Sequence, residues 1–156
     1  MVYVLIGGFA VIVQGYERLT ADIDLCYERS RDNIRRLVRV LVDLHAEPRA
    51  WPEGLPFLLD EEPILNGDTL TLSTDLGPVD IMGTPDGTHG FKDLAASQEL
   101  YEIAPGLTVA VASIPDLIRM KRASSTQSRR ARKDLDDIEA LSALAQMRSR
   151  RDSGIL

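Results

Sequence analysis

Residues that build disulfide networks, zinc sites and aromatic-rich cores are scarce in this sequence. Its 156 residues include a single cysteine, Cys26, and two histidines. One cysteine excludes a disulfide within the chain, and with two histidines it does not complete the four-ligand set of a structural zinc site. Aromatic residues make up 5% of the chain, so the core must rest on Leu, Ile, Val and Ala.

Long hydrophobic runs are absent as well. No apolar segment approaches the roughly 18 residues that a membrane helix needs. The apolar start, residues 1–13, lacks a basic leading segment and is interrupted by Gly7-Gly8, which is not the pattern of a signal peptide. We therefore expect a cytoplasmic protein with no membrane contact, in keeping with the single cysteine of a reducing compartment.

The charge is acidic overall but unevenly distributed. A formal net charge of −6 argues against a protein that coats nucleic acid by charge alone. Residues 121–133 nevertheless carry several Lys and Arg side chains and no acid, and Arg148, Arg150 and Arg151 form a second basic cluster. A local basic tract of this kind can hold a polyphosphate or an RNA backbone.

Hydrophobic periodicity predicts a mixture of strands and helices. Ser30 is a residue type preferred at helix N-caps, and His45 is expected to pack on the apolar face of the helix that follows. The remaining segments are predicted as a Pro- and Gly-rich loop at 48–63 and a polar, mobile connector at 124–130. Strands are expected at 2–6, 22–27, 68–74, 79–82 and 107–112, and helices at 9–14, 32–45, 91–99, 115–121 and 132–147.

This order of elements favours one fold class. Leu76-Gly77-Pro78 is expected to turn the chain into a hairpin. A hairpin among mixed strands and helices indicates an α+β domain with a mixed sheet rather than a doubly wound parallel one. We expect a single domain over residues 1–156, with a sheet-bearing core at about 1–112 and C-terminal helices at about 113–150.

Two aspartates lie two residues apart on the second predicted strand. Asp22 and Asp24 therefore point to the same face, with Cα atoms about 7 Å apart. Paired carboxylates of this kind suit hard divalent cations such as Mg²⁺, and without a cation they would repel each other. A solvated strand face is the alternative interpretation.

Two further features, combined with that pair, indicate a phosphate- and metal-binding site. Asp80 lies among apolar residues on a predicted strand, where a carboxylate needs a cation partner unless it reaches the sheet edge. Gly7-Gly8 lies between a buried strand and a helix, where glycines let a phosphate approach backbone N–H groups. A tight turn is the simpler explanation of the glycine pair.

Taken together, these motifs resemble a known family. VLIGGFA at 4–10 and RLTADIDL at 18–25 resemble the signature of the DNA-polymerase-beta-like nucleotidyltransferase superfamily. The resemblance is to its small bacterial branch, which includes abortive-infection-type nucleotidyltransferase toxins. LIRMKRAS at 117–124 and KDLDDI at 133–138 also resemble that branch. The resemblance covers nearly the whole chain and implies a nucleotidyltransferase-like mixed sheet flanked by helices.

The resemblance also implies roles for the motif residues. Gly7 and Gly8 would hold the triphosphate of an NTP substrate. Asp22, Asp24 and Asp80 would be catalytic residues that bind Mg²⁺ or Mn²⁺, in the two-metal arrangement for in-line displacement at phosphorus. Asp80 would also help to deprotonate the attacking hydroxyl.

Further residues would surround the nucleotide in such an enzyme. Lys121 would contact the phosphates as a point charge, with either Asp134 or Asp137 orienting it. Arg18 and Thr20 would flank the pocket.

The sequence departs from the family pattern in two places. More distant members have Gly-Ser where this chain has Gly7-Gly8, so no hydroxyl is available there for a phosphate. Residues 125–131 look like an insertion between Lys121 and Asp134.

The predicted activity is transfer of a nucleoside monophosphate from an NTP to an acceptor hydroxyl. The acceptor could be an RNA such as tRNA, bound through residues 121–133, in a toxin-like enzyme with a cognate antitoxin protein. A protein or a small molecule is the alternative acceptor. The other class of function is a non-catalytic, antitoxin-like binding protein with the same fold.

Overall fold

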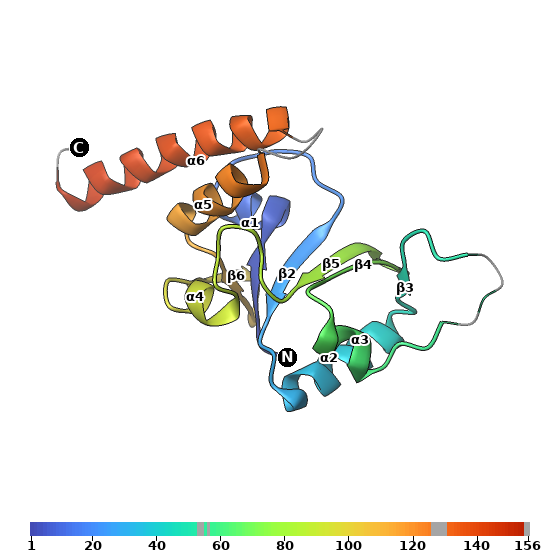
Figure 1. Ribbon diagram of the computed structural model, residues 1–156. Helices are drawn as coiled ribbons and strands as arrows, with labels where there is room; N and C mark the ends of the chain where they lie inside the picture. Colours follow the sequence, from blue (N-terminus) through green and yellow to red (C-terminus); the bar gives the residue numbers. More distant parts are fainter. Residues whose placement is uncertain (53–54, 56, 126–130, 155–156) are drawn as a thin grey trace.

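The computed structural model describes residues 1–52, 55, 57–125 and 131–154, which form both strands and helices (Figure 1). The strands are β1 (Tyr3–Ile6), β2 (Ile23–Tyr27), β3 (Glu47–Pro48), β4 (Thr69–Thr74), β5 (Gly77–Met82), β6 (Glu99–Ala104) and β7 (Leu107–Val111). The helices are α1 (Gly7–Val13), α2 (Arg31–Asp43), α3 (Glu61–Asn66), α4 (Phe91–Ala95), α5 (Ile114–Ser125) and α6 (Ala131–Asp152).

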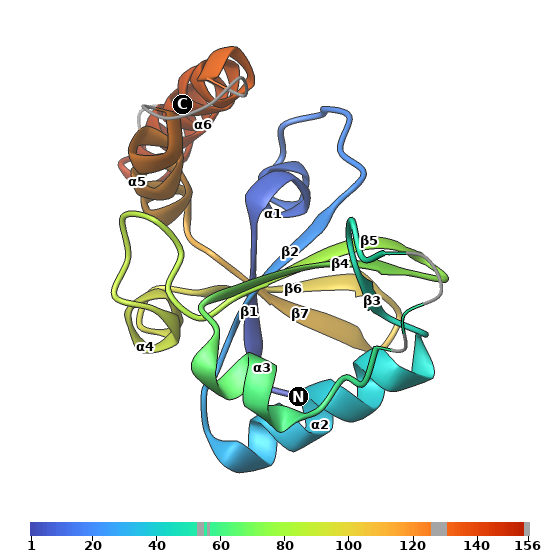
Figure 2. The same ribbon diagram turned by 45° about the vertical axis from the view of Figure 1, so that its right-hand side comes forward.

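All strands of the described residues join one seven-stranded sheet, in the order β3-β4-β5-β2-β1-β7-β6. The β2–β5 and β1–β7 pairs are parallel and the other pairs are antiparallel, so the sheet is mixed. Helices α1, α5 and α6 lie on one side of the sheet, and α2 and α3 lie on the other (Figure 2). The predicted α+β fold with a mixed sheet and C-terminal helices is confirmed.

Each face of the sheet has its own hydrophobic core. Buried side chains of β1, α1, α5 and α6, such as Val4 and Leu117, pack on one face. Side chains of α2, α3, β4 and β5, such as Leu37 and Ile81, pack on the other. Since successive strand residues alternate between the faces, this division fixes where every polar strand residue must point.

Helix α2 confirms its sequence pattern in detail. The hydroxyl of Ser30 accepts a hydrogen bond from the backbone N–H of Asn33 at 3.3 Å, as expected of an N-cap. The apolar residues Ile34, Leu37 and Leu41 are buried against the sheet. The helix nevertheless ends at Asp43, two residues earlier than predicted.

The expectation that His45 packs on that helix is wrong. The residue has a left-handed backbone (φ 49°), and its side chain is exposed. Its Nδ1 lies 2.6 Å from Oδ2 of Asp75. An ion pair with the hairpin loop has therefore replaced the predicted apolar contact.

The His45–Asp75 pair predicts a pH dependence. The hydrogen bond and the charge of Asp75 raise the pKa of His45 above its ordinary value of 6.5. Because the pKa of His45 is raised in the folded state, protonated His45 stabilises the fold. This contribution is fully present below pH 6.5 and is lost as the pH rises through the folded pKa. NMR titration should place the His45 midpoint above 6.5, and Asp75→Asn should lower it; a midpoint that Asp75→Asn does not change would contradict the pairing.

Three elements were not predicted. Strand β6 begins at Glu99, which the sequence pattern had assigned to a helix; α4 ends at Ala95 instead. Helix α3 begins inside the predicted loop at 48–63 and runs beyond it to Asn66, capped by the carboxylate of Asp60, which accepts from the N–H of Glu62 at 3.0 Å. The two-residue strand β3 is the third.

Several predicted boundaries also moved: α1 already begins at Gly7, β2 begins only at Ile23, and α6 runs on to Asp152. The expected turn at 76–78 is shorter, because Gly77 and Pro78 already belong to β5. Helix α5 runs to Ser125, so the predicted connector at 124–130 begins inside a helix, and residues 126–130 lie outside those described. No helix in the described part of the chain is long and apolar enough to cross a membrane.

Candidate active site

The fold brings the three predicted aspartates to one face of the sheet. Asp24 on β2 is the direct neighbour of Asp80 on β5 in a parallel register. Asp22 lies just before β2, and it is placed beside Asp80 by Arg49, which pairs with both carboxylates. That face lies under α1 and α5, because Ile6, which pairs with Asp24, belongs to the core on that side, whereas Val79 and Ile81 belong to the other core.

Arg49 bridges two of these carboxylates, and sequence reasoning missed it. Its Nη2 lies 2.6 Å from Oδ1 of Asp80, and its Nη1 lies 3.4 Å from Oδ2 of Asp22. One guanidinium therefore reaches an aspartate at each of two neighbouring strands. Arg49 lies in the segment predicted as a loop, and no local sequence pattern identifies it.

The chemistry of the three carboxylates suits a divalent metal ion. Carboxylate oxygens are the ligands that Mg²⁺ and Mn²⁺ prefer, and the strand register puts three such groups on one surface. In their present arrangement, however, no three His, Cys, Asp or Glu side chains among the described residues are grouped closely enough to hold a metal ion. Metal ligation by Asp22, Asp24 and Asp80 thus stays a prediction.

A pocket of about 390 Å³ opens beside the aspartates, a volume within the range of small-ligand sites. One side is lined by the end of β1, the first residues of α1 (Gly7 and Gly8) and the segment that leads into β2. The opposite wall comes from α5 and the start of α6. The pocket lining includes most predicted site residues, namely Gly7, Gly8, Arg18, Thr20, Asp22, Asp24, Lys121 and Asp134.

Two predicted site residues, Asp80 and Asp137, do not line this pocket. Asp80 lies beside it on β5, with 5% of its surface exposed. Sequence reasoning also missed part of the lining, including Met82, Pro85 and Asp86. Met82 ends β5 and the other two residues follow it, so the position of Asp80 on that strand was the one available signal for them.

Gly7 and Gly8, the first residues of α1, both lie so close to neighbouring side chains that there is no room for a Cβ. Gly7 has φ +64°, and a Cβ there would overlap the carboxylate of Asp24, 2.5 Å from its Cγ. A Cβ on Gly8 would collide with the side chain of Thr20, 2.9 Å from its Cβ. Gly7 thus brings the backbone directly against Asp24, and Gly8 brings it against Thr20.

Gly7→Ala should therefore disrupt the site. The new methyl group must displace the Asp24 carboxylate, and the left-handed backbone adds strain of about 1–2 kcal/mol. Gly106→Ala is a matched control, because its φ is +74° and a Cβ there meets nothing within 4 Å. We expect both variants to lose stability in urea unfolding, with the larger loss in Gly7→Ala because its methyl group overlaps Asp24, and Gly7→Ala alone to lose binding of an NTP. Equal ligand binding in the two variants would contradict this geometry.

A cluster of buried ion pairs lies on the α5 and α6 side of the pocket. The ammonium of Lys121 lies 2.5 Å from Oδ2 of Asp137 and 3.0 Å from Oδ1 of Asp134. Arg18 pairs with the same oxygen of Asp137. The sequence had left open which of the two acids meets Lys121, and both do. The cluster ties the segment before β2 to α5 and α6, and Lys121 itself lines the pocket.

Comparison with known proteins identifies the fold. No protein-family model and no curated protein sequence matches the chain. Among solved structures, the lincomycin-bound lincosamide antibiotic adenylyltransferase LnuA matches with a TM-score of 0.55 and 17% identity, over 91% of this chain and 86% of that one. This is a nucleotidyltransferase-like fold. At 17% identity the likeness establishes the fold alone.

Proposed function

We propose that this chain is a metal-dependent nucleotidyltransferase, which moves a nucleoside monophosphate from an NTP to an acceptor hydroxyl. The observation that carries the proposal is the proximity of Asp22, Asp24 and Asp80 on one side of the sheet, beside a pocket and the Gly7-Gly8 start of α1. The shared fold with LnuA, an adenylyltransferase, supports it. The proposal takes its roles for individual residues from the sequence motifs.

In this proposal Gly7 and Gly8 receive the triphosphate, and the three aspartates hold Mg²⁺ or Mn²⁺. Bound metal ions of this kind neutralise phosphate charge and orient the attacking and leaving oxygens. The acceptor oxygen forms a bond to the α-phosphorus, and the bond between that phosphorus and the bridging oxygen breaks. Pyrophosphate leaves with the electron pair, and the proton of the acceptor hydroxyl passes to the Asp80 carboxylate.

The positive side chains of the other wall have a complementary role. Lys121 is held by Asp134 and Asp137 at the pocket surface, where its ammonium can meet a phosphate as a point charge. Arg18 and Thr20 flank the same pocket. These contacts position the nucleotide before the acceptor arrives.

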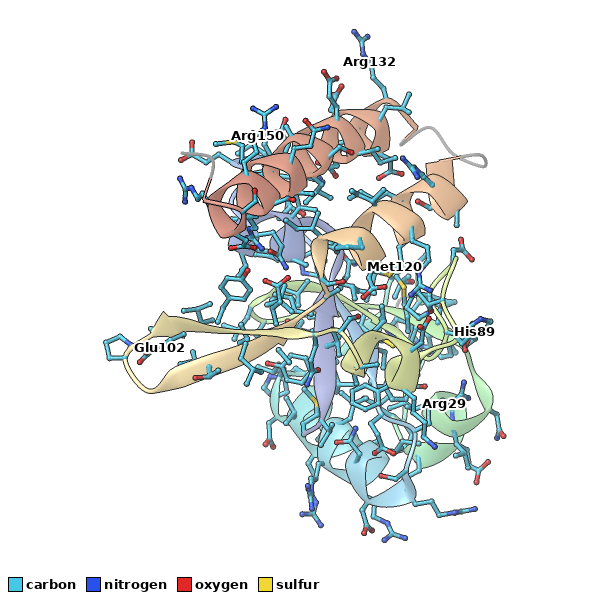
Figure 3. The ribbon with its side chains drawn as sticks, turned by 90° about the vertical axis from the view of Figure 1, so that its left-hand side faces the viewer. Arg29, His89, Glu102, Met120, Arg132 and Arg150 are labelled. Atoms are coloured by element: carbon cyan, nitrogen blue, oxygen red, sulfur yellow. The ribbon has the colours of Figure 1, made fainter. Side chains whose placement is uncertain are left out.

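Two acceptor classes have specific support. RNA is favoured by the toxin-like motifs and by basic side chains on α6, where Arg132 and Arg150 point outward from the body of the protein (Figure 3). A small molecule is favoured by the fold neighbour, whose substrate class is a lincosamide antibiotic. A protein hydroxyl is the third class to test.

The experiment is a transfer assay with each α-³²P-labelled NTP and Mg²⁺. The acceptors are total tRNA, a protein extract and a lincosamide. Label on tRNA would support the toxin-like enzyme, and label on the lincosamide would support an antibiotic-modifying one. No label on any acceptor would contradict the proposal and favour the binding-protein alternative, in which Asp22→Ala leaves the biological function unchanged.

A further inference from the structure

The contact between Arg49 and the aspartates needs its own explanation. Asp80 is the most buried of the three, with 7% of its side chain exposed, and a buried carboxylate is costly without a cation partner. Arg49 supplies that partner at 2.6 Å, although it belongs to a different part of the sheet. The bridge occupies the oxygens that the proposed function assigns to metal ions.

The arginine is anchored by its backbone, which leaves its side chain able to move. Its N–H donates to the carbonyl of Thr71 at 3.0 Å, next to the β3–β4 pairing. Beyond the ion pairs, its guanidinium makes a long 3.3 Å hydrogen bond from Nε to the carbonyl of Leu72. The side chain is 30% exposed, so it has access to solvent. Withdrawal of the guanidinium would therefore break no strand pairing.

A guanidinium and a divalent cation cannot share the same carboxylate oxygens. They are like charges, and at separations of a few Å their repulsion amounts to several kcal/mol even at a surface dielectric. The aspartates also repel one another when no cation is near. A positively charged side chain beside the aspartates reduces the repulsion between them when no metal is bound. It must move away when a metal ion binds, because the two positive charges would repel each other.

We propose that Arg49 is the resident counter-cation of this site: it holds Asp22 and Asp80 in place before metal binds, and it withdraws when a divalent ion arrives. The inference rests on the proposed metal-dependent function and adds a regulation of metal affinity to it. It also accounts for the present side-chain arrangement, in which the described carboxylates are not drawn together around a metal position. Arg49 is thus a positioning residue that competes with the cofactor.

The test measures Mn²⁺ binding by electron paramagnetic resonance in the full chain, with no nucleotide present. Arg49→Gln should bind Mn²⁺ about tenfold more tightly than the wild type, and its Tm without metal should be lower. Arg35→Gln is the matched control, because Arg35 also bridges two carboxylates, Asp32 at 3.2 Å and Glu61 at 3.1 Å, on the exposed surface of α2. Its Mn²⁺ affinity should equal that of the wild type.

Three outcomes would overturn the inference, and they are distinguishable. If the wild type and Arg49→Gln bind Mn²⁺ equally well, and Asp24→Asn weakens that binding, the counter-cation idea is wrong while the metal-dependent function survives. If neither protein binds Mn²⁺, both proposals fail in their metal requirement. Weaker binding by Arg49→Gln would show that the arginine supports the metal rather than competing with it.

A second measurement needs no variant, in case Arg49→Gln does not fold. Trp51 is the single tryptophan of the chain and lies two residues after Arg49. Its indole N–H donates to the carbonyl of Leu55 at 3.0 Å, and its ring contacts Phe57. Its backbone N–H donates to the carbonyl of Pro48 at 3.1 Å and so closes the turn that contains Arg49. Withdrawal of Arg49 should therefore change Trp51 fluorescence as Mg²⁺ saturates the wild type. Fluorescence that stays constant up to full occupancy would count against the withdrawal.

Discussion

Asp24→Asn should lower the transfer rate by at least about a thousandfold. The substitution keeps the shape of the side chain and removes the negative charge, so a metal ion loses an anionic ligand while the strand pairing with Ile6 and Asp80 is kept. Metal ions supply several kcal/mol of charge stabilisation in such reactions, and each 1.36 kcal/mol corresponds to about tenfold in rate. The rate is measured with saturating NTP and Mg²⁺.

Asp43→Asn is the control for that substitution. Asp43 is exposed at the end of α2, on the opposite side of the sheet from the pocket. Asp43→Asn also replaces a carboxylate with an amide, and we expect it to leave the transfer rate unchanged. Circular dichroism should show both variants folded. If Asp24→Asn keeps more than about a tenth of the wild-type rate, Asp24 is not a catalytic residue.

Asp137→Ala should destabilise the fold by about 3–5 kcal/mol. Asp137 is 1% exposed and pairs with both Lys121 and Arg18, so its removal leaves two largely buried cations poorly compensated. Asp136→Ala is the control, because this neighbour on α6 is exposed and its loss should cost within about 0.5 kcal/mol. Urea unfolding measures both. Equal stabilities would show that the cluster contributes nothing to holding α6 in place.

The parts of the fold that local patterns encode were predictable. The apolar spacing of α2 and its Ser30 cap depend only on neighbouring residues. The strand at residues 22–27 was predicted from alternation, because one of its faces is apolar and the other carries Asp22 and Asp24. The same alternation placed both acids on one surface.

Strand β6 could not be predicted in this way. It is an edge strand of mostly exposed residues, so neither face gives a clear alternation. Figure 3 shows the β6–β7 hairpin projecting from the rest of the molecule, with Glu102 near its tip. With Glu and Ala common in this segment, helix propensity and strand structure conflict, and the pairing with β7 decides the outcome.

Arg49 shows the limit of sequence reasoning about the site. Its position depends on the β3–β4 pairing and on the parallel neighbours β2 and β5, which are contacts between distant segments. The motifs identified the aspartates because their residue types carry the chemistry. They gave no indication of which cation lies between them.

A crystal structure of the protein with Mg²⁺ and a non-hydrolysable NTP is the most direct test of the central claim. We expect the triphosphate against Gly7 and Gly8, with metal ions bound by Asp22, Asp24 and Asp80. A nucleotide bound at another surface, or metal ions that leave Asp80 without a metal contact, would contradict the proposed active site.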